Sequence, residues 1–347
     1  MNAEPLLPES IFSETLPLLQ TAWDNTSLVL LKECPRKYYY AIIQGYRPKH
    51  KAAPLYFGGL FHASLEVYDS LRAEGHDHGT AQMAMIKYAM LGTMKLEMIP
   101  VAASDGTIEM KDSETGEVFM ALLVEHVTLW TSDDPVRSRV SLVRSLVWYT
   151  EHYKNDVLKT YIFPDGTPAI ELPFRFDLPI ETPSGDPYIY CGVIDKIAEM
   201  SNQLWNVERK HTKNTMSSSY FRNYNPNGQV TGYSFAGKVI LHAPVSGTIV
   251  DATQVTVGFN RHMRHIASRN EEQLNEWLVN TIHWIKQAEV YARQEFWPMN
   301  EESCHKFSGC QFVNICSKSP GSRQGWLEKE FVQNPWNPLK TKKEEDD

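Results

Sequence analysis

The 347-residue sequence has no long apolar run, since no stretch approaches the roughly 18 residues that a membrane-spanning helix needs. Its first residues, Met1-Asn2-Ala3-Glu4-Pro5, have neither the basic start nor the apolar segment of a signal peptide. The five cysteines are an odd number, which fits poorly with a disulfide framework. We therefore expect a soluble, cytoplasmic protein of a reducing compartment, with no membrane partner.

Two phosphate-binding signatures are also missing. Neither a GxxxxGK(S/T) loop nor a GxGxxG motif occurs, so the sequence gives no sign of an NTPase motor or a dinucleotide site. Hydrophobic residues make up 42% and charged residues 22%, a globular composition that excludes a disordered, collagen-like or coiled-coil chain. The length predicts about two domains, or one large one.

Acidic residues outnumber basic ones, but the two signs are distributed unevenly along the chain. The net charge is −8, which argues against a uniformly basic nucleic-acid binder. Residues 201–265 hold seven basic and two acidic side chains, a local charge of +5, which leaves −13 for the rest of the chain. Such a basic segment favours phosphate contacts, and the alternative is an ordinary solvated face.

The order of patterns predicts helices first and a β-rich part later. We expect helices at 28–34, 36–44, 56–72, 80–96, 118–130 and 135–153, with a loop or small hairpin at 101–117. We expect strands at 169–180, 188–199, 204–210 and 247–259, a helix at 229–241 between them, and a last helix at 271–296. This layout predicts an α/β core with a helical cap, followed by a solvated charged tail at 340–347.

Two short motifs carry the clearest chemistry. Asp195 ends Gly-Val-Ile-Asp, and Glu208 and Lys210 lie in Val-Glu-Arg-Lys thirteen positions later. A tight turn around residues 201–202 would place both carboxylates at neighbouring strand positions, about 5 Å apart. Residues 208 and 210 share one strand face, so the ammonium points to the same place.

Two carboxylates this close repel each other, and a Mg²⁺ or Mn²⁺ ion between them removes the cost. A metal, an ammonium and a phosphodiester together make a hydrolytic site. The alternative is a surface hairpin with ordinary charges. Glu171, on the preceding strand, is either an additional acidic group or a strand-edge residue.

His62, in Gly-Gly-Leu-Phe-His, and the helical pair Gln229 and Tyr233 mean little alone. In order, however, Gly-x-x-x-His, Gly-x-x-Asp, Glu-x-Lys and Gln-x-x-x-Tyr resemble the PD-(D/E)XK nuclease superfamily. The likeness is greatest to the branch with the RecB and AddB nuclease domains and the CRISPR adaptation nucleases. It extends over about residues 27–316, and Ile194 stands where the motif's name has proline.

The resemblance implies a restriction-endonuclease-like fold, a mixed central sheet flanked by helices. It implies that His62, Asp195 and Glu208 bind Mg²⁺ or Mn²⁺ and that Lys210 is catalytic. It also implies that Gln229 and Tyr233 contact DNA, and the basic segment adds the candidate DNA contacts Arg209, Lys213 and Arg222. The aromatic residues near that segment are candidates for base stacking or for the core: Tyr220, Phe221, Tyr224 and Phe259.

Four of the cysteines have a spacing of their own. Cys304, Cys310 and Cys316 are separated by five residues each, and Cys34 lies far upstream in Cys-Pro-Arg-Lys. Structural zinc favours pairs two to four residues apart, so a larger cluster fits better, and three unrelated buried thiols are the alternative. The same nuclease branch joins one early cysteine to three late ones around an iron–sulfur cluster, which implies a [4Fe–4S] cluster here. We expect Cys191 to be a buried structural thiol.

We accordingly divide the chain into five parts: an N-terminal extension (1–26), a helical region with Cys34 and His62 (27–160), a nuclease core (161–298), a cysteine region (299–320) and a C-terminal tail (321–347). The resemblance implies a metal-dependent exonuclease acting on DNA ends or single strands in recombination, repair or replication. It also suggests a standalone protein of phage type, in a bacterial or phage-infected host cytoplasm, working with a helicase or a single-strand annealing protein. The alternatives are a catalytically silent iron–sulfur DNA-binding scaffold and an electron-transfer iron–sulfur protein.

Overall fold

The computed structural model describes residues 11–49, 52–101, 108–111, 118–306 and 309–340, and for residues 95–129 the backbone alone. The N-terminal elements are β1 (Ala22–Trp23), α1 (Asn25–Glu33), α2 (Pro35–Tyr38), the π-helical turn η1 (Tyr39–Ile43), β2 (Tyr46–Pro48), α3 (Ala53–Ala73), α4 (His78–Gly92), β3 (Met94–Val101), β4 (Ile108–Lys111), β5 (Val118–Leu129), the short η2 (Pro135–Arg137) and α5 (Arg139–His152). The remaining elements are β6 (Lys159–Thr160), β7 (Ile170–Glu181), β8 (Pro187–Met200), β9 (Gln203–Thr212), α6 (Ser218–Arg222), α7 (Gly228–Leu241), β10 (Val245–Val255), β11 (Asn260–Ala267), α8 (Glu271–Arg293), η3 (Glu301–Ser303), α9 (Val313–Cys316), η4 (Pro320–Ser322), α10 (Arg323–Glu330) and β12 (Phe331–Gln333).

A mixed sheet of seven strands forms the centre of the fold. β7, β8 and β9 are antiparallel neighbours, β10 is parallel to β9, and β11 is antiparallel to β10. β6 and β1 add to the two edges of β8, where β1 is parallel. A parallel β9–β10 pair needs a crossover, and α7 provides it.

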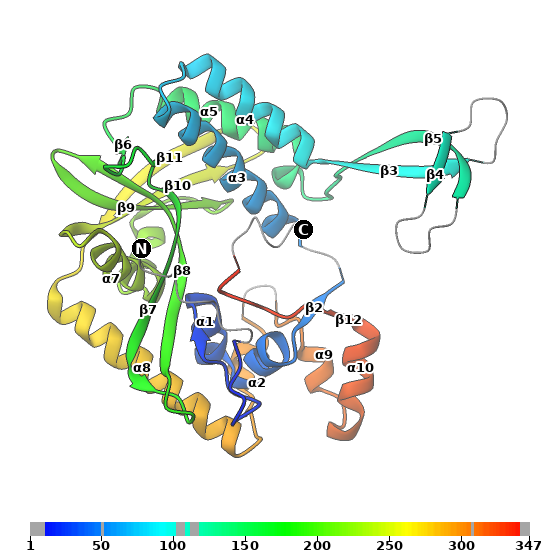
Figure 1. The fold of residues 1–347 in the computed structure, drawn as a ribbon, viewed down its shortest axis with the longest axis vertical. Helices are drawn as coiled ribbons and strands as arrows, with labels where there is room; N and C mark the ends of the chain where they lie inside the picture. The colour runs from blue at the N-terminus through cyan, green and yellow to red at the C-terminus, as the bar shows by residue number, and fades with distance from the viewer. Residues whose placement is uncertain (1–10, 50–51, 102–107, 112–117, 307–308, 341–347) are drawn as a thin grey trace.

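Helices cover both faces of this sheet (Figure 1). On one face α7 packs on β7 to β10, with α8 and α1 against it. On the other, α3 contacts β7 and α5 contacts β10 and β11, while α4 packs on both helices. The predicted α/β fold with a mixed central sheet flanked by helices is confirmed.

Local sequence explains why the two helices after β9 form where they do. Asn227 caps α7 by accepting the amide of Val230, and Asn270 and Gln273 form a reciprocal capping box at α8. The buried stripe of α8, with Trp277 and Ile285, packs in the same apolar cluster as Tyr190 and Ile194 of β8.

One predicted element in the N-terminal half is wrong, and the end of another is misplaced. The helix expected at 118–130 is the strand β5, and the helix expected at 80–96 ends at Gly92, after which β3 begins. β5 pairs with β3 and β4 in a separate three-stranded sheet that projects from the helical layer (Figure 1). Residues 118–129 contain three valines and a threonine, and this β-branched content outweighs their helical spacing.

The other elements lie close to their predicted bounds, with two further differences. The expected helix 36–44 is α2 followed by the π-turn η1, and the expected strand 247–259 is β10, ending at Val255 and followed by the unpredicted β11. The expectations for residues 1–10, for most of the loop at 101–117 and for the tail at 341–347 fall outside the described residues.

Both ends of the described chain join the same side of the molecule. β12 pairs antiparallel with β2, with Val332 opposite Arg47. Phe312 and Phe331 stack at 4.9 Å between ring centroids and belong to the same apolar cluster as Tyr38 and Trp23. The cysteine region therefore packs directly on the segment that holds Cys34.

Candidate active site

The candidate site lies where β8 and β9 separate. Their ladder runs from Met200–Gln203, around a turn at Ser201 and Asn202 with positive φ at both residues, to Lys196–Val207. The next pair in this register would be Asp195 and Glu208, but there the strands part. Oδ2 of Asp195 accepts the backbone amide of Arg209 at 2.8 Å, in the place of a ladder hydrogen bond. The structure thus brings the two predicted carboxylates together.

Glu208, Lys210 and Gln229 form a linked set on the α7 face of β9. The ammonium of Lys210 forms an ion pair with Oε1 of Glu208 and donates to Oε1 of Gln229 at 3.0 Å. Nε2 of Gln229 in turn donates to Oε1 of Glu208 at 3.0 Å. Gln229, in the first turn of α7, therefore holds the lysine and the carboxylate in one position.

His62 lies on α3, which packs on the sheet face opposite to α7, and its side chain extends to Asp195. Its Nδ1 lies 3.6 Å from Oδ2 of Asp195. Gly58, one turn earlier, allows this approach, because a Cβ there would overlap Nε2 of His211 on β9. Gly192 plays a similar part on β8, where a Cβ would lie 2.8 Å from the ring of Phe174. Both glycines of the sequence motifs are thus places of close packing.

The environment separates the two carboxylates electrostatically. Burial alone would raise the pKa of Asp195, but His62, Lys210 and the amide of Arg209 together hold that pKa below its usual range. Burial raises the pKa of Glu208 to about 6; the charge of Asp195 adds to this effect and the ammonium of Lys210 opposes it. The pKa of Lys210 is raised, since Glu208 outweighs the effect of burial.

One oxygen of this site stands out. Oε2 of Glu208 is buried and has no hydrogen-bond partner among the described residues. A buried carboxylate oxygen of this kind is costly unless a donor or a cation satisfies it. In the part of the chain that the structure describes, no three His, Cys, Asp or Glu side chains form a ready-made metal cluster. The donor set of Asp195, Glu208 and His62 nevertheless has the oxygen-rich chemistry of a Mg²⁺ or Mn²⁺ site.

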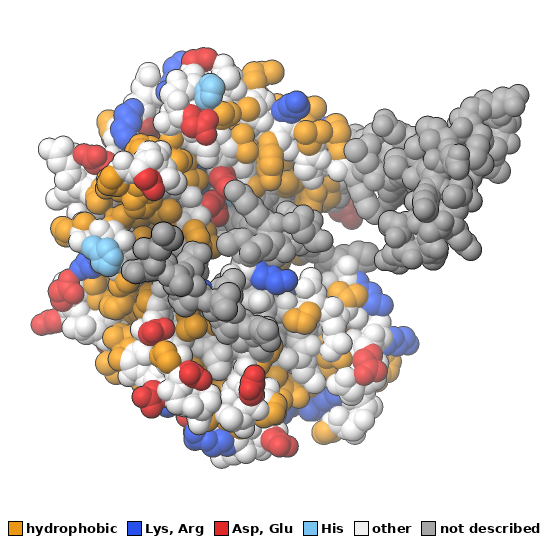
Figure 2. All heavy atoms as spheres, viewed as in Figure 1, with side chains coloured by type: hydrophobic (Ala, Val, Ile, Leu, Met, Phe, Trp, Pro, Cys, Tyr) orange, Lys and Arg blue, Asp and Glu red, His pale blue; other side chains and the backbone are white. Residues whose placement is uncertain are grey.

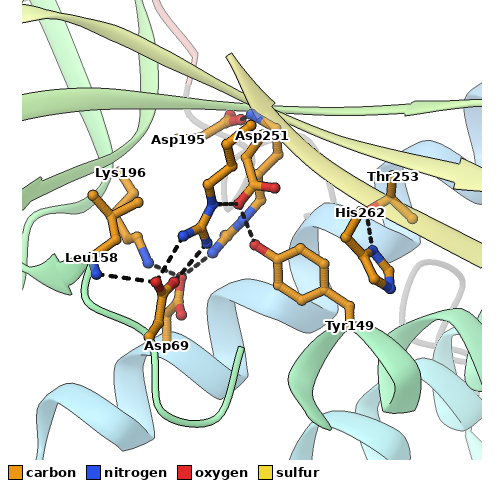
Figure 3. A network of polar contacts seen from close by, with 11 residues as sticks. Asp69, Tyr149, Leu158, Asp195, Lys196, Asp251, Thr253 and His262 are labelled. Carbon is orange, nitrogen blue, oxygen red and sulfur yellow. Dashed lines mark hydrogen bonds and ion pairs between the residues drawn. The ribbon is translucent and has the colours of Figure 1, made fainter. Parts of the chain in front are cut away.

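A second charged network lies on the opposite face of the same strands, and sequence reasoning missed it (Figure 3). Asp69 of α3 forms ion pairs with Arg209 and, at 3.2 Å, with Lys196. Asp251 accepts from Tyr149 at 2.6 Å and from Arg264 at 3.0 Å. A sequence signal existed, since Asp69 lies seven residues after His62 and shares its helix face.

The predicted DNA contacts fall into two groups. Lys213 and Arg222 are exposed, beyond the end of β9 and at the end of α6. Arg209 is only 4% exposed and pairs with Asp69, so the prediction that it contacts DNA is wrong. Tyr233 is half-buried and packs edge-on against Phe174 at 5.6 Å between ring centroids.

Much of the basic excess of residues 201–265 is neutralised internally. Four of its seven basic side chains pair with acidic ones: Arg209, Lys210, Lys238 and Arg264. On the face drawn in Figure 2, the described basic and acidic side chains are interspersed and form no large patch of one sign. Charge contributes less to a nucleic-acid surface here than the sequence suggests.

The four aromatic residues near the basic segment differ in their exposure. Tyr220 and Tyr224 are half-buried beside the site, with their hydroxyls 3.1 Å apart, and their electrostatic neighbours include Lys210 and Glu208. Phe221 is buried against His265, whereas Phe259 is 46% exposed near the β10–β11 turn. Tyr220, Tyr224 and Phe259 remain accessible to a nucleic acid, and Phe221 is a core residue.

The four spaced cysteines lie in one region, at the contact between the two ends of the chain. Cys34 ends α1, and its Sγ accepts the amide of Asn300 at 3.4 Å. Cys304 and Cys310 are joined by a backbone hydrogen bond of 2.8 Å. The pKa values of Cys304 and Cys316 are raised, first by burial and then by neighbouring cysteines of this set. Cys191 is buried on β8, as predicted, and all five cysteines are free.

The last predicted residue, Glu171, lies on β7 next to Asp195. Its neighbours Ile170 and Leu172 pair with Lys196 and Ile194, so its backbone faces that of Asp195 across the strands. Its φ of 47° is in the left-handed region, an unusual conformation for a non-glycine residue in a strand.

A mixed sheet flanked by helices, with two carboxylates and a lysine where its central strands part, is the arrangement of restriction-endonuclease-like proteins. The chain belongs to the PD-(D/E)XK nuclease superfamily, whose family model matches residues 24–317. A comparison with curated proteins gave no match.

Two solved structures resemble the chain only distantly. One, a "Putative exonuclease" from Eubacterium rectale, has 9% sequence identity and a TM-score of 0.43, over 91% of this chain and 100% of that one. The other, a protein designated SSO0001, has 12% identity and a TM-score of 0.25, over 42% of this chain and 59% of that one. The chain thus spans less than two thirds of the second protein. Likenesses at this level carry no functional conclusion. None of the described helices is long and apolar enough to cross a membrane.

Proposed function

We propose that this nuclease-superfamily chain is a Mg²⁺- or Mn²⁺-dependent deoxyribonuclease, acting as an exonuclease on DNA ends or single strands. The observation that carries the proposal is the convergence of His62, Asp195, Glu208 and Lys210 at the point where β8 and β9 part. The unpartnered Oε2 of Glu208 supports a cation there, since a cation would satisfy it.

In this proposal Asp195, Glu208 and His62 hold the ion, which would polarise the scissile phosphate as a Lewis acid. Lys210 orients the attacking water and stabilises negative charge on the phosphate. Its raised pKa keeps it protonated at neutral pH, so it acts in the first place as a cation. Gln229 fixes the ammonium through its 3.0 Å hydrogen bond and is a positioning residue.

The DNA contacts we propose are those that the surface leaves accessible. Lys213 and Arg222 are exposed and have no ion-pair partner in the described part of the chain, so they can meet phosphates. Tyr220 and Tyr224, beside Lys210 and Glu208, can stack on an unpaired base. Since the sequence has no NTPase motif, we propose that a helicase or a single-strand annealing protein supplies or receives the strand.

We further propose that Cys34, Cys304, Cys310 and Cys316 hold a [4Fe–4S] cluster with a structural role. Their gathering where the chain ends meet supports it, as does the amide hydrogen bond to Sγ of Cys34, a type of contact that tunes thiolate ligands. A cluster there would close a loop of about 270 residues and so constrain the unfolded chain.

Digestion of linear and covalently closed circular DNA, with Mg²⁺ or Mn²⁺ and anaerobically purified protein, tests the nuclease proposal. Linear DNA should be lost and circles should survive, and Lys210→Ala should abolish the loss. Lys87→Ala, an exposed lysine on α4, is the matched control and should digest like wild type. Wild type that binds DNA with both ions but leaves every substrate intact would instead favour the catalytically silent scaffold.

A further inference from the structure

A cavity of about 320 Å³ opens on the face of the sheet opposite to the candidate active site. It lies between α3, α5, the segment that leads into β6, and the strands β8 and β9. Because side chains alternate along a strand, Arg209 faces this cavity while Glu208 and Lys210 face α7. None of His62, Asp195, Glu208 or Lys210 lines it, so the cavity is separate from the hydrolytic site.

The lining of this cavity is strongly basic for a chain of net charge −8. Its basic side chains are Arg72, Lys154, Lys159, Lys196 and Arg209. Only two acidic side chains, Asp69 and Asp156, accompany these five, which leaves an excess of three positive charges. Two of these side chains already pair with residues outside the lining, Asp156 with Arg264 at 2.6 Å and Lys154 with Glu151 at 3.6 Å, and the two outside partners cancel each other in charge. The excess of positive charge in the lining therefore favours the binding of an anion.

Two of these cations are buried at the bottom of the cavity, and one of them has a hydrogen-bond donor without an acceptor in the described part of the chain. Lys196 and Arg209 are 6% and 4% exposed, and both turn to the single carboxylate of Asp69. Nε of Arg209 is buried and has no acceptor among the described residues. Two buried cations that share one carboxylate are incompletely compensated, and an incoming anion would complete them.

The mouth and wall of the cavity add exposed cations and aromatic side chains, which suit a phosphate ester of a nucleoside. Arg72 and Lys159 are exposed at the mouth, and Lys159 has no acidic partner in the described part of the chain. Tyr68, Tyr149 and Tyr153 give the wall aromatic surface, which suits a planar base. The volume lies at the lower end of the roughly 300–1,000 Å³ typical of small-molecule sites, as a mononucleotide requires.

We infer that this cavity binds a free mononucleotide through its phosphate monoester, at a site distinct from the hydrolytic one. The phosphate lies toward Lys196 and Arg209, with Arg72 and Lys159 closing over it. A terminal phosphate of a DNA strand has the same chemistry, but a cavity of about 320 Å³ holds about one nucleotide, so the further nucleotides would lie outside it.

Calorimetric titration of the full-length protein in EDTA tests the inference, because it needs neither a divalent cation nor nuclease activity. A failure here is thus distinguishable from a failure of the proposed function. The ligands are deoxyadenosine 5′-monophosphate, inorganic phosphate, deoxyadenosine, and an oligonucleotide with a 5′-phosphate or a 5′-hydroxyl. The monophosphate should bind, the nucleoside should not, and inorganic phosphate should bind more weakly.

Arg72→Gln and Lys159→Gln, both at exposed positions that leave the core intact, should each weaken the monophosphate roughly tenfold, the size of one charged hydrogen bond. Lys87→Gln, which does not line the cavity, should bind like wild type. Equal affinity in all three variants, or no binding of the monophosphate, would overturn the inference. The inference would also be overturned if the 5′-phosphorylated oligonucleotide bound and the monophosphate did not.

Discussion

The backbone amide of Arg209 donates to Oδ2 of Asp195 at 2.8 Å, while its guanidinium pairs with Asp69 on the other face of the sheet. One residue of β9 thus contacts both the candidate hydrolytic site and the buried charged network beneath it. The position of Asp195 depends on the course of β9, and that course depends on the ion pairs of α3.

Replacing Gln229 tests whether it positions Lys210. Gln229→Ala removes the two 3.0 Å hydrogen bonds that join Gln229 to Lys210 and to Glu208, and it leaves α7 capped by Asn227. We expect kcat to fall by roughly 10²-fold, with KM and thermal stability little changed, since misplacement of a reacting group costs about that much. Gln324→Ala, on α10, is the control. A loss that falls on KM alone would show that Gln229 binds substrate instead.

Two adjacent glycines of α3 should respond in opposite ways. Gly58→Ala places a methyl group against Nε2 of His211 and should cost about 1–3 kcal/mol of unfolding free energy. It should also push His62 away from Asp195 and reduce nuclease activity. Gly59→Ala meets nothing within 4 Å and should stabilise the helix by about 1 kcal/mol. Urea unfolding of both variants is the measurement, and equal stability of the two would contradict the packing of α3 on β9.

Loss of the carboxylate of Asp69 should be severe. Asp69→Asn leaves the buried Lys196 and Arg209 without their shared anion, and we expect a cost of about 3–5 kcal/mol. Asp133→Asn, an exposed aspartate, should be neutral. Adding Lys196→Met to Asp69→Asn should recover part of the loss, because it removes one of the two unpaired cations. Strictly additive effects in denaturant titrations of this cycle would rule out the ion pair.

The pH dependence of stability should contain a term from His262. Burial, followed by the charge of His152, lowers the pKa of His262 from its ordinary 6.5 to about 4. Between pH 6.5 and 4, His262 binds a proton in the unfolded chain but not in the folded protein. The free energy of unfolding therefore decreases as the pH falls through this interval. After discounting for partial exposure, we expect the loss to be about 2 kcal/mol.

His262→Gln should make the stability profile less steep over that interval, with the part due to the buried His211 remaining, whereas the exposed His283→Gln should leave the profile unchanged. Thermal unfolding between pH 4 and 7 measures the effect. A His262→Gln profile that still falls as steeply as wild type would assign the acid sensitivity to other groups.

Metal analysis distinguishes the spaced cysteines from the fifth one. Anaerobically purified wild type should contain about four iron atoms per chain, as a [4Fe–4S] cluster requires, and should absorb visible light. Cys34→Ser should lose most of the iron and destabilise the contact between the chain ends. Cys191→Ser should keep it, because Cys191 lies on β8 away from the set. Stoichiometric zinc in place of iron would refute the cluster while keeping the ligands.

The sequence predicted the parts of the site that depend on short-range order. The turn at Ser201 and Asn202 fixes the register of β8 and β9, so the meeting of Asp195 and Glu208 follows from counting residues. Gln229 was found only through the order of motifs that resembles the nuclease superfamily, because the helical pair Gln229 and Tyr233 means little alone.

The remainder depends on contacts between distant segments, which no local pattern encodes. Asp69 and Arg209 are 140 positions apart, and the burial of Arg209 was invisible in a segment that seemed basic and exposed. The projecting sheet of β3 to β5 was misread because Val118–Leu129 fits helical and extended spacing alike. The strand β11 was missed because Arg and His dominate its sequence.

The packing of both chain ends into one apolar cluster also bears on the time course of synthesis. Trp23 and Tyr38 leave the ribosome early, but their partner Trp297 and the nearby Phe331 are made last. Until then an aromatic surface stays uncovered, although the strands that carry Asp195 and Glu208 are already complete. A chain cut short before Trp297 would keep this surface exposed to proteases, so fragments that hold Asp195 and Glu208 without the C-terminal aromatic residues should be degraded faster than the finished chain.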